Sequence, residues 1–153
     1  MKRDFILPSE QQKAVSGTAN VLIDSLGPFD GVVATFKTDG EVVRVTAKQQ
    51  FDSKRSAVLI FEFGANINNG QHEYTKESGL YLTYMLVEDV GWGTQYIFYS
   101  AVYGSGTVKV TFDSHQGTLA VGFDLDVQND ETEPRLNAIG AFRDVSGLEH
   151  MKK

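Results

Sequence analysis

The chain has 153 residues, of which 41% are hydrophobic and 22% are charged, and its formal net charge is −6. This balance is typical of a folded globular domain rather than a disordered chain, and a negative charge opposes binding to the phosphate backbone of nucleic acids. The sequence has no cysteine, which excludes disulfides, thiolate metal ligands and cysteine nucleophiles.

The length is that of one domain, so we expect a single domain over residues 1–153. No apolar run approaches the roughly 18 residues of a membrane span. The apolar run Phe5–Leu7 is also far shorter than the core of an export signal, about 7–15 residues. We therefore expect a cytoplasmic protein without a membrane span.

Short alternating segments begin after an N-terminal segment, residues 1–16. In that segment, Ser9-Glu-Gln-Gln12 has the spacing of a capping box and predicts a short helix before Gly17. Strand patterns follow, and residues 146–153 are predicted to fray. The predicted strands are 18–23, 32–37, 42–51, 57–63, 71–75, 80–87, 94–103, 107–112, 118–127 and 136–145.

The clearest pattern lies in residues 104–127. Two runs that alternate apolar and polar residues, 107–112 and 118–127, flank the five residues 113–117. Strict alternation indicates a strand with one buried face, and Gly117 suits the positive φ that a hairpin loop needs. Residues 104–127 are therefore predicted to form a β-hairpin.

Hairpin connections recur through the chain, and no helical pattern is long enough to cross between parallel strands. Thr38-Asp-Gly40 is the sharpest turn signal, because Asp-Gly between alternating runs suits a tight hairpin. The fold class is thus all-β and antiparallel. We expect a two-sheet β-sandwich of jelly-roll or immunoglobulin-like type, with a closed barrel as the second choice, since closure also protects strand edges.

Three segments near the C-terminus resemble a known family. Residues 106–111, 117–123 and 140–145 are similar to the last three strands of small bacterial β-sandwich lipoproteins of unknown function. The resemblance implies a sandwich and no particular activity. Those proteins carry an acylated cysteine, which this sequence lacks.

The acidic stretch 124–133 is the only candidate metal site. It departs from the EF-hand pattern, because Asn129 stands where the calcium loop needs glycine. Asp124 and Asp126 alternate with apolar residues and are expected to face solvent. We predict no metal site and no cofactor.

Catalytic motifs are also missing. No serine lies in a G-x-S-x-G elbow, and the histidines His72, His115 and His150 fall in turns, loops or near the chain end. Gly91-Trp-Gly93 begins like a dinucleotide fingerprint but has tyrosine in place of the third glycine. We therefore predict no catalytic residues.

The strands 80–87 and 94–103 carry apolar residues on both faces, whereas a sandwich strand needs only one apolar face. The second face must be covered by a loop or the N-terminal segment, by a second subunit, or by a ligand that stacks on aromatic rings. The candidate ligand or interface residues are Tyr84, Trp92, Tyr96, Tyr99 and Tyr103.

The sequence thus indicates a non-enzymatic binding or assembly module that acts through this aromatic hairpin. Its expected partner is a second copy in a homodimer. A carbohydrate-binding module is the alternative, because aromatic rings also stack on sugar faces. A hydrolase with an unrecognised site ranks third.

Overall fold

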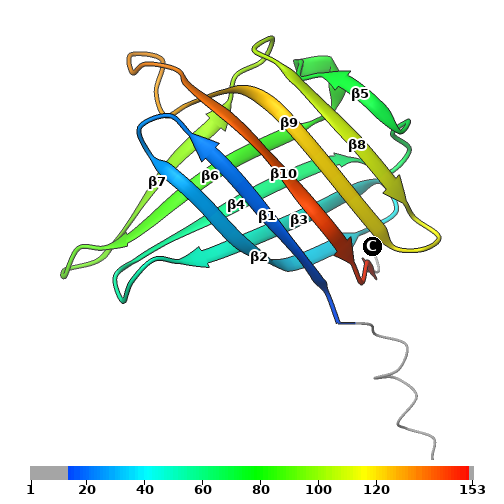
Figure 1. Cartoon of the computed structure of the whole chain (residues 1–153), viewed down its shortest axis with the longest axis horizontal. Coiled ribbons are helices and arrows are strands. Elements are labelled where there is room, and N and C mark those ends of the chain that lie inside the picture. The colour runs from blue at the N-terminus through cyan, green and yellow to red at the C-terminus, as the bar shows by residue number, and fades with distance from the viewer. Residues whose placement is uncertain (1–13, 152–153) are drawn as a thin grey trace, which may run out of the picture.

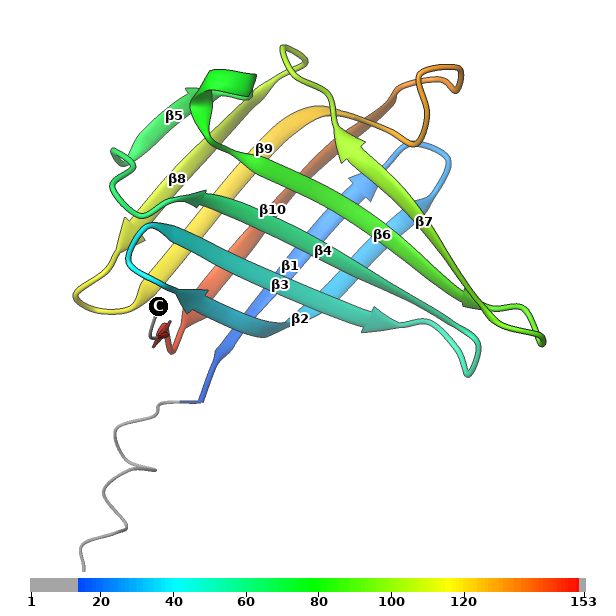
Figure 2. The same cartoon turned by 180° about the vertical axis from the view of Figure 1, so that it is seen from behind.

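The computed structural model describes residues 14–151, and strands dominate them (Figures 1 and 2). All ten predicted strands are present. The elements are β1 (Ser16–Ile23), β2 (Gly27–Thr38), β3 (Val42–Gln50), β4 (Arg55–Gly64), β5 (Gly70–Glu73), the 3₁₀-helix η1 (Lys76–Ser78), β6 (Tyr81–Asp89), β7 (Thr94–Ala101), β8 (Thr107–Asp113), β9 (Thr118–Gln128), β10 (Leu136–Ser146) and β11 (Glu149–His150).

Eight of the strands close into an antiparallel barrel. The order around the barrel is β10, β1, β2, β3, β4, β6, β7 and β9, and β9 returns to β10. This architecture is the second of the two that the sequence predicts. The two-sheet sandwich, the first choice, is not confirmed.

Strand β2 explains how the sheet curves. It has 12 residues and pairs with β1 through its first half and with β3 through its second half. The register with β3 shifts between Val33 and Thr35, which is a β-bulge. A bulge bends a strand and increases its twist. The bend lets β2 pair with β1 in its first half and with β3 in its second half without a break in the strand.

Strand β9 completes the barrel by pairing with β10 along one edge and with both β8 and β7 along the other edge. The pairing with β10 extends over most of the length of β9. On the shared edge, residues Thr118–Asp124 pair with β8, and only Val127 and Gln128 pair with β7. Strand β5 pairs in turn with β8, outside the closed circuit.

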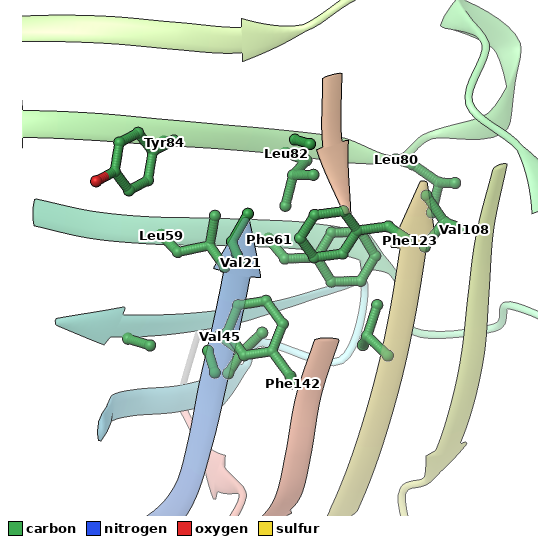
Figure 3. Packing of buried hydrophobic residues seen from close by; sticks show 14 of the residues in the cluster. Val21, Val45, Leu59, Phe61, Leu80, Leu82, Tyr84, Val108, Phe123 and Phe142 are labelled. Carbon is green, nitrogen blue, oxygen red and sulfur yellow. The ribbon is translucent and has the colours of Figure 1, made fainter. Parts of the chain in front are cut away.

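Large apolar side chains fill the inside of the barrel (Figure 3). The rings of Phe61 and Phe63 stack with centroids 5.4 Å apart, and Phe142 lies 6.4 Å from Phe61 across the barrel. Phe29 meets Tyr84 edge-on at 5.6 Å. The contacts of Phe61 with Phe142 and of Phe29 with Tyr84 join strands that are far apart in the sequence, so the core holds the closed barrel together.

Tyr74 fills the place where β6 lacks a neighbouring strand. Strand β6 pairs with β7 only from Thr83 onward, and the backbone N–H of Leu82 donates to the Tyr74 hydroxyl at 3.0 Å. The backbone of Tyr74 also bonds to Gly104 and Gly106 in the β7–β8 connection, at 2.7 and 2.9 Å. One buried phenol therefore satisfies a backbone donor that the sheet leaves over.

The two ends of the chain differ from expectation in different ways. The predicted helix near Ser9–Gln12 lies outside the described residues. Of the C-terminal residues predicted to fray, those up to Met151 are held instead, because β11 pairs in parallel with β2 and Met151 N–H donates to the Thr38 carbonyl at 2.7 Å; residues 152 and 153 lie outside the described residues.

Among residues 14–151, no helix is long and apolar enough to cross a membrane.

The inward and outward faces of β9 are testable. Phe123 is buried, whereas Asp124 is exposed. We expect Phe123→Ala to lower the free energy of unfolding by about 3–5 kcal/mol, and Asp124→Ala to change it by no more than about 0.5 kcal/mol. Urea unfolding measures both values, and equal losses would place β9 out of register by one residue.

Close approach of two backbones at Gly106 gives a second prediction. A methyl group at this position would overlap the Asp124 carbonyl oxygen, whereas one at Gly122 would meet no atom within 4 Å. We expect Gly106→Ala to destabilise the protein by about 1–3 kcal/mol in thermal unfolding. Gly122→Ala is the matched control and should leave the melting temperature nearly unchanged.

Candidate interaction surface

Strands β4, β6 and β7 carry apolar side chains toward solvent as well as toward the core. Along β6, Leu82 and Tyr84 face the core, so Met85 and Val87 face outward. The register places Phe98 opposite Met85 and Tyr96 opposite Val87. We call this surface the outer apolar face, and its residues are Val58, Ile60, Tyr81, Met85, Val87, Tyr96 and Phe98.

The outer apolar face is open to solvent along β7. Tyr96 is 56% exposed and Phe98 is 48% exposed. On the other side the face ends at β3, whose outward residues include Arg44 and Lys48. Arg44 forms an ion pair with Glu62 at 3.4 Å along this border. An apolar surface with a polar rim is the usual arrangement of an interaction site.

The β6–β7 hairpin extends beyond the barrel to a tip at residues 90–93 (Figure 2). Val90 N–H donates to the Gly93 carbonyl at 3.0 Å, and Gly91 has φ 91°, which favours glycine. Trp92 lies in this tight turn with 91% of its surface exposed. The turn therefore presents the only tryptophan of the chain to solvent.

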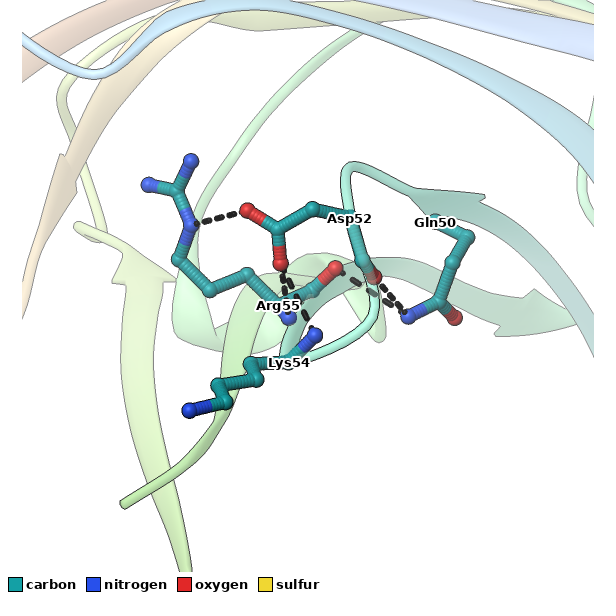
Figure 4. Close-up of polar contacts among 4 residues, drawn as sticks. All are labelled: Gln50, Asp52, Lys54 and Arg55. Carbon is teal, nitrogen blue, oxygen red and sulfur yellow. Dashed lines mark hydrogen bonds and ion pairs between the residues drawn. The ribbon is translucent and has the colours of Figure 1, made fainter. Parts of the chain in front are cut away.

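A polar turn between β3 and β4 supports the hairpin from one side (Figure 4). Asp52 accepts hydrogen bonds from the backbone N–H groups of Lys54 and Arg55, at 2.8 Å each, and from Arg55 Nε at 3.1 Å. The Lys54 N–H, followed by the Arg55 side chain, lowers the pKa of the Asp52 carboxyl. The Lys54 carbonyl then accepts from Asp89 N–H at 2.8 Å, which ties the turn to β6.

The five tyrosine and tryptophan residues predicted from the sequence do not share one surface. Tyr84 is only 2% exposed, and half-buried Tyr99 lies against it with ring centroids 6.4 Å apart. These two residues oppose each other in the β6–β7 register and both face inward. Tyr103 is exposed but stacks on Tyr74 at 5.5 Å, beyond the end of β7. Only Trp92 and Tyr96 lie on the exposed part of the hairpin.

Sequence reasoning missed the contribution of β4 and of Phe98. The middle of strand β4 carries apolar residues on both faces, as β6 does, and its outward Val58 lies beside Met85. The same signal that singled out the hairpin therefore also marks β4. Phe98 lies in the predicted strand 94–103, whose two apolar faces could not be assigned to core or solvent without the register.

Three hollows in the described part of the chain lie outside the outer apolar face. One of about 690 Å³ is lined by His115 and His150, a shallow one of about 870 Å³ lies over β2 and β3, and one of about 260 Å³ borders the end of β7. None of these three is lined by Trp92, Tyr96 or Phe98.

Chemistry-bearing side chains are dispersed in the part of the chain that the structure describes. Within it, no three His, Asp or Glu side chains form a group that could hold a metal ion. The ring of His72 donates from Nε2 to the Asn68 carbonyl at 2.6 Å. No hydrogen bond within residues 14–151 joins the ring of His115 or His150 to a hydroxyl or a carboxylate.

Comparison with known proteins found no matching family model, no matching curated protein and no matching solved structure.

Two buried tyrosines make the stability of the fold sensitive to alkaline pH. Burial raises the pKa of both Tyr74 and Tyr84 from 10.0 to about 12. Their contribution to the free energy of unfolding is fully present below pH 10, where the folded and the unfolded chain both keep the phenol proton. It is lost between pH 10 and 12, because the unfolded chain releases the proton first. Urea unfolding should therefore show a falling free energy of unfolding across this interval.

Tyr84→Phe is the control for this effect. The Tyr84 hydroxyl makes no hydrogen bond within the described residues, so the substitution should change stability little at pH 8. We expect a shallower decline above pH 10 than in the wild type. An unchanged decline would mean that Tyr84 ionises without unfolding the protein.

Proposed function

We propose that this protein is a non-enzymatic binding or assembly module that acts through the outer apolar face. One observation carries the proposal: the outward side of β4, β6 and β7 carries the seven residues of the outer apolar face, with the buried Thr83 among them, although the inner faces of the same strands already supply the core. In water, a contiguous apolar surface of this kind is stabilised when a partner covers it.

Other exposed apolar side chains do not form a comparable surface. Leu22 on β1 is 63% exposed and lies between Ile139 on β10 and Pro28 on β2, and the group is bordered by Asn20, whose amide donates to Asp30 at 2.8 Å. Small groups of exposed apolar residues are common on folded proteins and need no partner. The outer apolar face differs in extent, because it brings together seven residues on three adjacent strands.

The chemistry of this surface favours a protein partner. Tyr96 and Phe98 offer large, stiff rings that bury much area for little loss of side-chain entropy. The aliphatic side chains of Val58, Met85 and Val87 lie beside these rings on the same face of the sheet. Such a surface contacts an apolar protein surface over a broad area, and it offers few hydrogen-bonding groups for the hydroxyls of a sugar.

Carbohydrate binding is the second candidate, and the exposure of Trp92 favours it. A tryptophan ring that is 91% exposed at a rigid hairpin tip is suited to stacking on a sugar face. This candidate predicts that Trp92→Ala abolishes binding in a glycan screen, whereas Phe98→Ser has little effect.

The main proposal is tested by sedimentation over a wide range of protein concentration. We expect reversible self-association that Tyr96→Ser and Phe98→Ser each weaken about tenfold or more, since central aromatic residues of an interface contribute more than about 1 kcal/mol each. Both side chains are about half exposed, so the variants should keep the wild-type circular dichroism spectrum.

Leu22→Ser is the matched control, because it removes an exposed apolar side chain outside the outer apolar face. It should leave self-association unchanged. A protein that stays monomeric at all concentrations and binds no glycan would overturn the proposal.

A further inference from the structure

The β7 strand has an open edge on the side away from β6. Residues Thr94–Ser100 pair with β6, but only Ser100 and Ala101 pair with β9. Residues 94–99 therefore have no strand partner on that side within the described part of the chain. In an antiparallel ladder, about half of the N–H and C=O groups of such a strand point away from its neighbour. These groups form a ready template for another strand.

Proteins usually block such an edge with charges, proline, bulges or a very short strand. Residues 94–99 read Thr-Gln-Tyr-Ile-Phe-Tyr and contain neither a charge nor proline. Their register with β6 is regular, without a bulge. No charged residue occurs from Val90 to Val108. The β7 edge thus lacks all four of the usual protections.

The outer edge of β5 shows the contrast within the same molecule. Strand β5 also lacks a partner on one side among residues 14–151, but it has only four residues. It carries His72 and ends at the charged Glu73. One open edge of this fold is therefore blocked in the usual ways, and the other is left available.

We propose that β7 pairs in antiparallel fashion with β7 of a second copy of this chain, across a two-fold axis. This inference rests on the proposed function and names its partner and its geometry.

Charge favours a second copy at this edge. Each copy has a formal charge of −6, so two copies repel each other unless they meet where charge is absent. A two-fold axis through β7 also brings each residue near its own counterpart, which would place like charges together on a charged strand. The uncharged segment Val90–Val108 meets both conditions.

The geometry also ends the assembly at two copies. In a two-fold pair, each chain uses the same edge, so the contact consumes both open β7 edges. The short, charged β5 edge does not continue the sheet. In the joined sheet, Tyr96 and Phe98 of both copies lie on one side, so the two outer apolar faces become continuous.

The absence of cysteine allows a direct test in the full chain. We would introduce single cysteines at each position from Thr94 to Phe98 and oxidise each variant mildly. Antiparallel pairing across a two-fold axis places one residue opposite its own counterpart, about 4.5–5.5 Å away, which is within disulfide range. We expect a covalent dimer that peaks at one position and is at least tenfold less abundant one residue to either side.

Gln71→Cys on the β5 edge and Val32→Cys on the outward face of β2 are matched controls, since both positions are exposed. They should give no dimer above background. Hydrogen exchange of the wild type supplies a second readout. Among residues 94–99, the amides that point away from β6 should exchange quickly in dilute protein and slowly in concentrated protein.

The other outcomes separate the two proposals. Self-association that Phe98→Ser weakens, without a covalent dimer at any position from 94 to 98, would overturn edge pairing and leave the proposed function standing. Slow exchange, in a dilute monomer, of the amides of residues 94–99 that point away from β6 would mean that another segment of the same chain covers the edge, which also overturns it. A chain that is monomeric at every concentration overturns edge pairing, and the proposed function then depends on the glycan screen.

Discussion

The shared edge of β9 is the constraint on which the rest of the structure depends. Because β8 pairs with Thr118–Asp124, only the last two residues of β9 remain for β7. The barrel closes through that short contact and through the continuous core inside it. As a consequence, residues 94–99 keep an open edge.

The same constraint explains why the β6–β7 hairpin combines two properties that folded proteins usually keep apart. Its inner face continues the core through Tyr84 and Tyr99, and its outer face exposes Tyr96 and Phe98. An apolar face and an open edge on one strand form an aggregation risk unless a specific partner covers them. The proposed function and the proposed pairing mode are two consequences of this arrangement.

The sequence alone located the strands, because alternation reports local burial and turn residues mark the boundaries. Gly117 has φ 70° in the predicted 113–117 loop, and Gly40 has φ 94° in the predicted Asp-Gly turn. Phe123 and Leu125 face inward as the pattern indicates. The first half of β2 was missed, because Pro28 and Gly31 are uncommon within strands.

Only the tertiary structure decided between barrel and sandwich, since closure depends on pairs such as β1–β10 and β7–β9 that are distant in the sequence. It also decided which aromatic residues are available to a partner. Where both faces of a strand are apolar, alternation separates Tyr84 from Met85 but does not say which one faces the core. The register with neighbouring strands settles that choice, and it places Tyr84 and Tyr99 inside and Phe98 outside.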